Sequence, residues 1–190
     1  MKAWLLLLAA LLPAAAMAQP RADPDWPCAQ RLVPQLAAGA LWPGLAAGDW
    51  RGVPEVAALV ARIAPRAVEE AAGVAAIQDF ATALDAEARR NLLHLAFTGT
   101  LEETNRQRDL LIAQIRRFAR HQRDLAERVR GLEAALRAAP DAAREELAQR
   151  HFFAAKSYTD AERTLRFACE APVRLEARMG AYARAMQAAD

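Results

Sequence analysis

Large apolar residues recur at alternating steps of three and four along the middle of the chain. From Leu101 to Leu136 this stripe carries eight of the ten large apolar residues. Its positions, which we call the first seam, are 101, 104, 108, 111, 115, 118, 122, 125, 129, 132 and 136. Such spacing over about five heptads is typical of a helix that packs lengthwise against another helix. The pattern predicts one long helix at residues 85–138, with Asp85 as its N-cap.

A second stripe of the same spacing follows after a short break. Its positions, the second seam, are 147, 151, 154, 158, 161, 165, 168, 172, 175, 179, 182 and 186. Pro140 in the break disfavours helix in the residue before it, and Asp141 can cap the helix that follows. Residues 85–138 and 141–188 therefore predict an antiparallel coiled-coil hairpin, in which residue i faces roughly residue 279 − i. Pro172 is expected to kink or break the second helix.

The segment before the hairpin divides into two parts. Two amphipathic patterns within residues 54–84 predict two short helices, the second at about 68–84. Residues 19–53 hold five of the ten prolines and three of the four tryptophans, namely Trp26, Trp42 and Trp50. Proline at this density excludes a long helix, so we predict an extended N-terminal arm that the tryptophans anchor on the helices. A surface on which a sugar or another ligand stacks is the alternative interpretation of these tryptophans.

Four apolar residues lie off the seams near the open end of the hairpin: Leu110, Ile112, Phe167 and Val173. They predict that the two short helices and the N-terminal arm pack there. Toward the turn, the large apolar residues off the seams are Phe152 and Phe153. We therefore expect an all-α protein with a compact base and a coiled-coil arm that projects about 30 to 40 Å, at about 1.5 Å per residue.

The first residues have the features of a cleaved signal peptide. Met1 and Lys2 precede an apolar run, and Ala16-Met17-Ala18 forms an A-x-A cleavage site. The apolar run is shorter than the roughly 20 residues that span a bilayer. We therefore predict a signal peptide at residues 1–18 and a single helical domain at residues 19–190. Export to the periplasm follows, with no stable membrane insertion after cleavage.

Both cysteines, Cys28 and Cys169, lie in the expected mature chain. Export would place them where disulfides form and persist. A bridge between them would close a loop of about 140 residues, for which chain-entropy estimates reach about 5 kcal/mol. The rival interpretation is a redox-active or metal-binding pair. It has less support, because the chain has no C-x-x-C and two isolated cysteines do not complete a metal site.

Composition and motifs favour a non-catalytic protein. The formal net charge of +2 gives no general reason to expect nucleic acid or an anionic membrane as a partner. The histidines His94, His121 and His151 are far apart in the predicted register, so we expect neither a metal site nor a cofactor. The chain also lacks a glycine-rich phosphate loop and an H-E-x-x-H motif.

Three groups of residues are candidate sites. The first is the basic stretch of the first long helix, from which Arg116, Arg120 and Arg123 could meet an acidic partner, although such runs are commonly solvated helix faces. The second is the pair Phe152 and Phe153, which could be an exposed docking patch or the contact of a homodimer. The third, near the cysteines, is the junction of Trp26, Arg108 and Glu170, where the register brings Arg108 within reach of Glu170.

Several short runs resemble a group of uncharacterised exported helical proteins of proteobacteria, mostly α-proteobacteria. The matching runs are Trp26-Pro27-Cys28-Ala29-Gln30-Arg31, Val33-Pro34, Leu41-Trp42-Pro43-Gly44 and Cys169-Glu170-Ala171-Pro172-Val173. The resemblance covers nearly the whole mature chain and implies a periplasmic location and a Cys28–Cys169 bridge. It implies no activity.

The leading functional hypothesis is a non-catalytic periplasmic interaction or scaffold protein that presents a coiled-coil arm to a protein partner. A periplasmic chaperone or stress protein is a variant of it. The alternative is a ligand-binding or thiol-redox accessory protein that acts where Cys28 and Cys169 meet. A redox role predicts that Cys28→Ser abolishes function without loss of stability, whereas a scaffold role predicts strong destabilisation.

Overall fold

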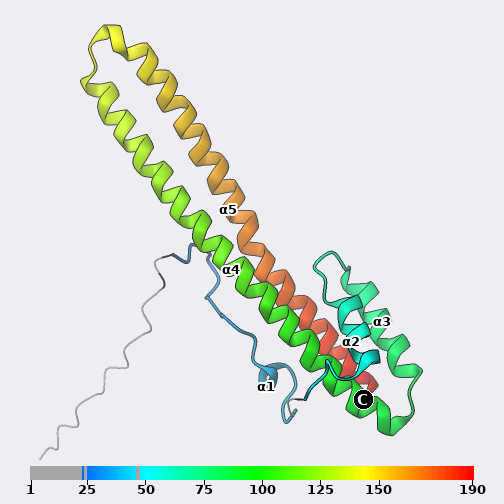
Figure 1. Cartoon of the computed structure of the whole chain (residues 1–190). Coiled ribbons are helices and arrows are strands. Elements are labelled where there is room, and N and C mark those ends of the chain that lie inside the picture. Colours follow the sequence, from blue (N-terminus) through cyan, green and yellow to red (C-terminus); the bar gives the residue numbers. More distant parts are fainter. Residues whose placement is uncertain (1–22, 24, 46–47) are drawn as a thin grey trace, which may run out of the picture.

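The computed structural model describes residues 23, 25–45 and 48–190, and in this part of the chain five helices are joined by irregular segments. The helices are α1 (Ala38–Leu41), α2 (Pro54–Ile63), α3 (Glu70–Thr82), α4 (Ala86–Ala138) and α5 (Asp141–Ala189). α4 and α5 lie side by side as one long hairpin, which confirms the predicted all-α fold (Figure 1). The predicted signal peptide, residues 1–18, lies outside the described residues.

Local signals in the sequence account for the helix ends. The carboxylate of Asp85 accepts a hydrogen bond from the backbone N–H of Ala88 at 2.9 Å and caps α4. α2 begins at Pro54, whose fixed φ and missing N–H suit the first turn of a helix. α3 is a few residues shorter than predicted, and the arm predicted to be extended contains the single turn of α1 as well as hydrogen-bonded turns at Asp23–Trp26 and Trp50–Val53. None of the described helices combines the length and the apolar character that a membrane span requires.

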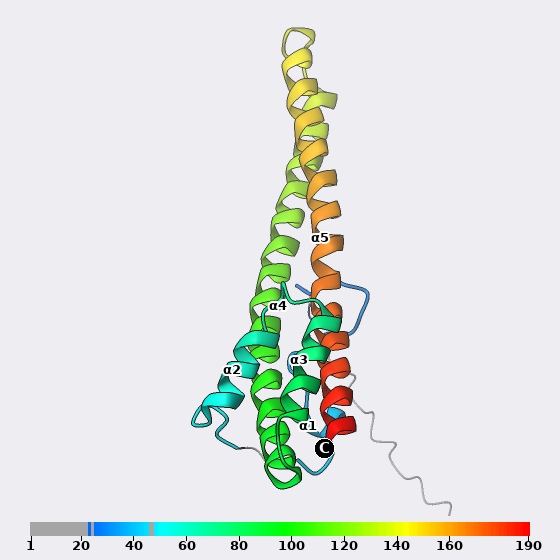
Figure 2. The ribbon, with the colours of Figure 1, turned by 90° about the vertical axis from the view of Figure 1, so that its right-hand side faces the viewer.

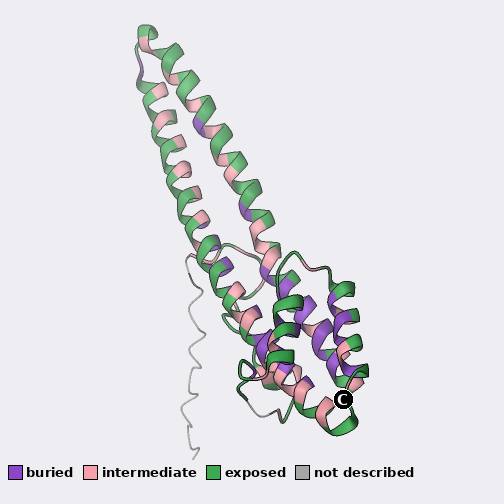
Figure 3. Ribbon diagram, turned by 45° about the vertical axis from the view of Figure 1, so that its right-hand side comes forward, coloured by how far each residue is buried: buried purple, intermediate pink, exposed green. Residues whose placement is uncertain are grey.

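Both seams are the buried faces of the hairpin. Every position of the first and second seams is buried or half-buried, whereas most other positions beyond Ile112 toward the turn are exposed (Figure 3). The contacts agree with the predicted register, since Arg108 bonds to the carbonyl of Pro172 and Ile115 packs with Leu165. The spacing of apolar residues therefore identified the packed face of each helix correctly.

Pro172 does not break the last helix, so the expectation of a break is wrong. α5 runs without interruption from Asp141 to Ala189, and Pro172 is buried on the second seam. A proline inside a helix lacks the N–H that would bond to the carbonyl four residues earlier. Seam packing on both sides of Pro172 holds the helix together across this gap, because tertiary packing supplies most helical stability.

The open end of the hairpin holds the main hydrophobic core. α2 packs on α4 and α3 packs on α5, so four helices enclose this base (Figure 2). The fully buried side chains here include Ile63, Ile77, Phe97 and Tyr182. Arg178 of α5 is only 8% exposed and donates to three backbone carbonyls at the end of α2 and in the loop that follows. Its guanidinium thus ties α5 to the short helices.

The short helices pack closer to the open end than predicted. Leu110, Phe167 and Val173 were expected to be covered, yet they are 63%, 64% and 48% exposed. Of the four off-seam residues only Ile112 is buried. The reason is that the apolar faces of α2 and α3 pack on the large side chains of α4 and α5 around Phe97. This contact buries more apolar surface than packing on Leu110, Phe167 and Val173 would bury.

Two helical glycines allow this base to pack closely. At Gly99 an added Cβ would lie 2.6 Å from Cδ2 of Trp50 and 2.9 Å from Cγ2 of Val60. At Gly73 it would overlap the ring of Tyr182. The absence of a side chain at these positions is therefore what lets the N-terminal arm, α2 and α3 reach the hairpin.

We predict that Gly99→Ala destabilises the protein and that Gly131→Ala stabilises it. The methyl group at position 99 would push apart Trp50 and Val60, at a cost of about 1–3 kcal/mol. Gly131 has nothing within 4 Å of an added Cβ, so alanine there gains about 1 kcal/mol of helix propensity. Urea denaturation followed by circular dichroism measures both changes. Equal shifts in the two variants would contradict the close packing at Gly99.

Candidate functional site

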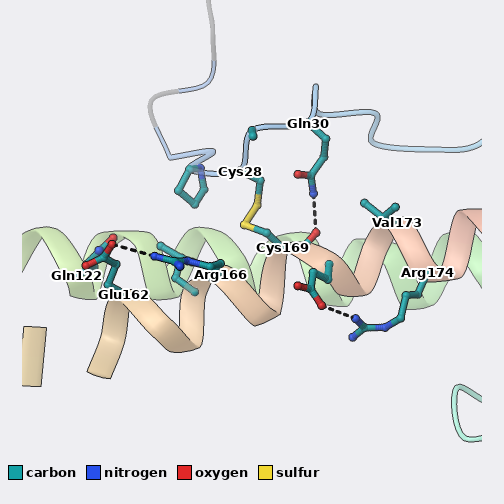
Figure 4. A pocket seen from close by; sticks show the side chains of 12 residues that line it. Cys28, Gln30, Gln122, Glu162, Arg166, Cys169, Val173 and Arg174 are labelled. Atoms are coloured by element: carbon teal, nitrogen blue, oxygen red, sulfur yellow. Dashed lines mark hydrogen bonds and ion pairs between the residues drawn. A yellow bond between two sulfur atoms is a disulfide. The ribbon is translucent and has the colours of Figure 1, made fainter. Parts of the chain in front are cut away.

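Asp23 and residues 25–36, which we call the strap, lie across the outside of the hairpin (Figure 1). Cys28 of the strap is bonded to Cys169 of α5, with a Cα–Cα distance of 5.6 Å, which confirms the predicted disulfide (Figure 4). Beside it, the side-chain amide of Gln30 donates to the carbonyl of Cys169. The bridge joins residues 141 apart in the sequence and so fixes the strap on α5.

The three tryptophans of the N-terminal arm pack against the helices. Trp26 lies beside the disulfide, on a small cluster of buried residues from α4 and α5. Trp42 places its ring edge against Phe97, with ring centroids 5.4 Å apart. Trp50 is 7% exposed, and its indole N–H donates to Glu102 at 2.9 Å. These contacts favour the packing interpretation over a ligand-stacking surface.

Arg108 is a buried cation that links the strap to both long helices. It lies on the first seam and is 3% exposed. Its Nη1 donates to the carbonyl of Pro172 at 2.8 Å, and its Nη2 donates to the carbonyl of Val33 in the strap at 2.7 Å. Burial lowers the pKa of the guanidinium, and the carboxylate of Glu176 at 3.7 Å acts in the opposite direction. Arg108 therefore acts as a structural crosslink within the protein.

The expected contact between Arg108 and Glu170 is wrong. Glu170 is exposed, and its carboxylate pairs with Arg174 one helical turn further on, at 2.9 Å. The reason lies in the geometry of α5, because Glu170 lies two residues from the seam position Pro172 and therefore faces away from α4. The charged neighbour of Arg108 is Glu176 instead.

Asn105 holds the strap in a way that the sequence analysis missed. Its side-chain oxygen accepts from the backbone N–H of Leu36 at 2.8 Å, and its amide donates to the Leu36 carbonyl at 3.0 Å. One side chain thereby replaces both hydrogen bonds that a neighbouring strand would make. The only signal in the sequence was a polar amide directly beside the first seam.

The basic stretch of α4 binds the chain's own strap. Arg116 donates through Nε and Nη2 to the carboxylate of Asp23, at 2.9 and 2.7 Å. Arg120 donates to one oxygen of Asp25 at 2.8 Å, and Arg123 donates to the other at 2.5 Å. The three arginines that were expected to meet an acidic partner are therefore paired within the described part of the chain.

These contacts keep both strap carboxylates charged. The pKa of Asp23 lies below its usual value, first because the carboxylate accepts from the backbone N–H of Asp25 and then because it accepts from Arg116. Hydrogen bonds from Arg120 and then Arg123 likewise lower the pKa of Asp25. Both carboxylates stay in contact with solvent, which screens each individual ion pair.

Phe152 and Phe153 lie on the part of the hairpin between residues 124 and 160, which we call the distal hairpin. The two rings are 63% and 57% exposed and meet edge to face, with centroids 5.6 Å apart. The remaining outward positions of the distal hairpin are mainly charged or polar. The structure thus brings Arg116, Arg120 and Arg123 to the strap, separates Glu170 from Arg108, and leaves Phe152 and Phe153 on the distal hairpin.

An open groove of about 730 Å³ runs beside the disulfide. Its lining includes Pro27, Gln122, Leu165 and Val173 together with both cysteines (Figure 4). The charged groups along it form ion pairs with one another, Arg166 with Glu162 and Arg174 with Glu170. No cluster of metal-ligating side chains occurs among residues 23, 25–45 and 48–190. Chemically, the groove is an apolar trough with a paired charged rim.

Comparisons with protein families, with curated proteins and with solved structures found no match for this chain. The resemblance to exported proteins of proteobacteria therefore stays a prediction. The functional argument depends on the geometry of the strap, the groove and the distal hairpin.

We predict that replacing both Cys28 and Cys169 with serine lowers the free energy of unfolding substantially. Opening a loop of this length costs at most about 5 kcal/mol by chain entropy. Guanidinium denaturation in oxidising buffer measures the change. As a control, reductant should destabilise the wild type and leave the double serine variant unaffected. A double variant as stable as the oxidised wild type would contradict a structural disulfide.

Proposed function

We propose that this protein is a non-catalytic interaction protein that presents the distal hairpin to a protein partner. The observation that carries the proposal is the exposed pair Phe152 and Phe153 on an otherwise polar surface. Aromatic side chains are enriched at protein interfaces, where they bury a large area at little entropic cost. Folding of the hairpin itself does not use this pair, since both rings lie off the seams.

The arrangement of the short helices and the strap on the hairpin supports this proposal. Among the described residues, α2 and α3 pack on the base and the strap crosses the middle of the hairpin, so the distal hairpin stands clear of both (Figure 2). Arg108, Asn105 and the disulfide fix the strap and the two helices to one another. A rigid base then holds a projecting surface in a defined direction, which suits a scaffold.

A periplasmic location is part of the proposal. A disulfide that joins distant segments fits an oxidising compartment. The A-x-A motif at Ala16-Met17-Ala18 would allow cleavage of a signal peptide during export. The resemblance to exported proteobacterial proteins points in the same direction.

We predict that Phe152→Ala together with Phe153→Ala abolishes partner binding and leaves stability unchanged. Exposed rings contribute little to folding, so the free energy of unfolding should change by less than about 0.5 kcal/mol. A photoreactive amino acid at Gln149, one turn before the pair, should give a crosslinked adduct in intact cells that the double variant reduces at least fivefold.

The matched control is Phe167→Ala, because Phe167 is equally exposed on α5 but lies outside the distal hairpin, two residues before Cys169. It should leave the Gln149 adduct intact. If Phe167→Ala alone removes the adduct, the partner does not bind through Phe152 and Phe153, and the proposal is wrong. An adduct of two copies of this chain would identify the patch as a homodimer contact and contradict a different protein partner.

A second candidate function is supported by the groove beside the disulfide. A trough of about 730 Å³ next to a half-buried disulfide has the size of a ligand site. In this case the protein binds a ligand or exchanges thiols at Cys28 and Cys169. Loss of function in the double serine variant without loss of stability would favour this candidate over the scaffold.

A further inference from the structure

The strap is attached to the helices more firmly after Cys28 than before it. On the later side, Leu36 is buried in the main core, and both its backbone groups bond to the side chain of Asn105. The carbonyl of Val33 accepts from the buried guanidinium of Arg108. These contacts do not involve the disulfide, so we expect them to hold this half of the strap whether or not the sulfurs are bonded.

Asp23 and residues 25–27, which we call the leading segment, have weaker attachments. The carboxylates of Asp23 and Asp25 pair with arginines of α4 whose side chains are 39%, 53% and 50% exposed. Ion pairs at this exposure contribute little to stability. The indole N–H of Trp26 donates to the Gln30 carbonyl at 2.8 Å, which is a bond within the strap itself. Two further attachments are the packing of the Trp26 ring and the disulfide.

The leading segment packs on a small apolar cluster between α4 and α5. The buried members of this cluster are Ile115, Ala119 and Leu165, which are 1%, 2% and 6% exposed, and Trp26 packs against them. Leu165 also lines the groove of about 730 Å³ beside the disulfide. The cluster therefore borders the groove, and departure of the Trp26 ring would add the cluster to the apolar surface of the groove.

We propose that the Cys28–Cys169 disulfide is a redox switch whose reduction releases the leading segment and uncovers this cluster. The reductant is a dithiol. One of its thiolates attacks a sulfur of the bridge and forms a mixed disulfide, and its second thiol then displaces the remaining cysteine. The products are free thiols at Cys28 and Cys169 and a disulfide within the reductant, so two electrons and two protons pass to this protein.

The disulfide lies where a dithiol can reach it. Cys28 and Cys169 are both half-buried, and both line the open groove (Figure 4). The bridge also explains why weak contacts hold the leading segment at all. Asp25 lies three residues from Cys28, so the intact bridge keeps this carboxylate at a high effective concentration beside its arginines. Reduction removes that advantage and leaves the ion pairs and the Trp26 ring to hold the segment.

This switch goes beyond the scaffold function, because it lies on the strap and does not involve Phe152 or Phe153. It assigns a conformational change to the disulfide and requires no ligand in the groove. A distal hairpin without a partner would therefore leave the switch unaffected, and a strap that stays in place on reduction would leave the scaffold unaffected.

The test follows the indole N–H signals of the full chain by ¹⁵N NMR before and after reduction with dithiothreitol, a small dithiol. Trp26→Phe assigns the signal of Trp26 by its disappearance. We expect the Trp26 indole proton to exchange with water at least tenfold faster in the reduced protein, because release of the leading segment breaks its bond to the Gln30 carbonyl. The Trp50 indole, which bonds to Glu102 of α4, should exchange at an unchanged rate.

Two results would overturn the proposal. An unchanged exchange rate at Trp26, in protein that thiol titration shows to be fully reduced, would mean that the leading segment stays in place. Equal acceleration at Trp26 and Trp50 would mean that reduction loosens the whole base rather than this segment. Circular dichroism of the same samples should show that the helices are retained.

A matched variant tests the covering role of the indole without redox chemistry. Trp26→Ala in the oxidised protein should increase the fluorescence of the apolar dye bis-ANS at least threefold, as reduction should in the wild type, because both uncover the same cluster. Reduction of the Trp26→Ala variant should add little to this increase. Dye fluorescence at the wild-type level in the oxidised variant would show that the indole does not cover the cluster, and the proposal would be wrong.

Discussion

The packing of α4 against α5 along their seams is the interaction on which the rest of the structure depends. Each helix buries one stripe and leaves its other faces to solvent, because two helices alone cannot surround a core. Among the described helices, α2 and α3 therefore reinforce the hairpin at its base, and no further helix packs on it toward the turn. Where α2 and α3 pack, the seam residues from Met179 to Met186 are almost fully buried, whereas most seam positions beyond Leu125 are half-buried.

Polar and covalent crosslinks hold the strap where apolar contacts are few. Arg108 reaches the strap from inside the seam, Asn105 pairs with its backbone, and Cys28 bonds to α5. The small cluster around Ile115 is the apolar part of this region. The buried guanidinium donates to two carbonyls, and the nearby carboxylate of Glu176 offsets its charge, although its Nε is buried without a hydrogen-bond partner among the described residues. The strap thereby joins the two helices without adding a layer of helix.

The sequence predicts the repeating pattern of this protein and two local features, the Asp85 cap and the disulfide, but not the contacts of the irregular strap. The steps of three and four gave the buried faces of both long helices, and the short break at Pro140 gave the hairpin and its register. Glu170 shows the limit, because the register placed it near Arg108 while its position on the outward face of α5 paired it with Arg174. The partners of Arg116 and Asn105 depend on the path of an irregular strap, which no periodicity encodes. The positions of α2 and α3 on the hairpin were also predicted incorrectly. They depend on the volume of the side chains around Phe97, which the spacing of apolar residues does not describe.

The strap also divides the hairpin by charge. It crosses α4 at the point where arginines become dense, and its two aspartates neutralise part of that face while the arginines beyond it face solvent. Exposed ion pairs add little to stability individually, so the bonds from Arg120 and Arg123 to Asp25 fix the direction of this end of the strap more than they stabilise the fold. The turn at Asp23–Trp26, in which the N–H of Trp26 donates to the Asp23 carbonyl and the N–H of Asp25 donates to the Asp23 carboxylate, presents both carboxylates to these arginines.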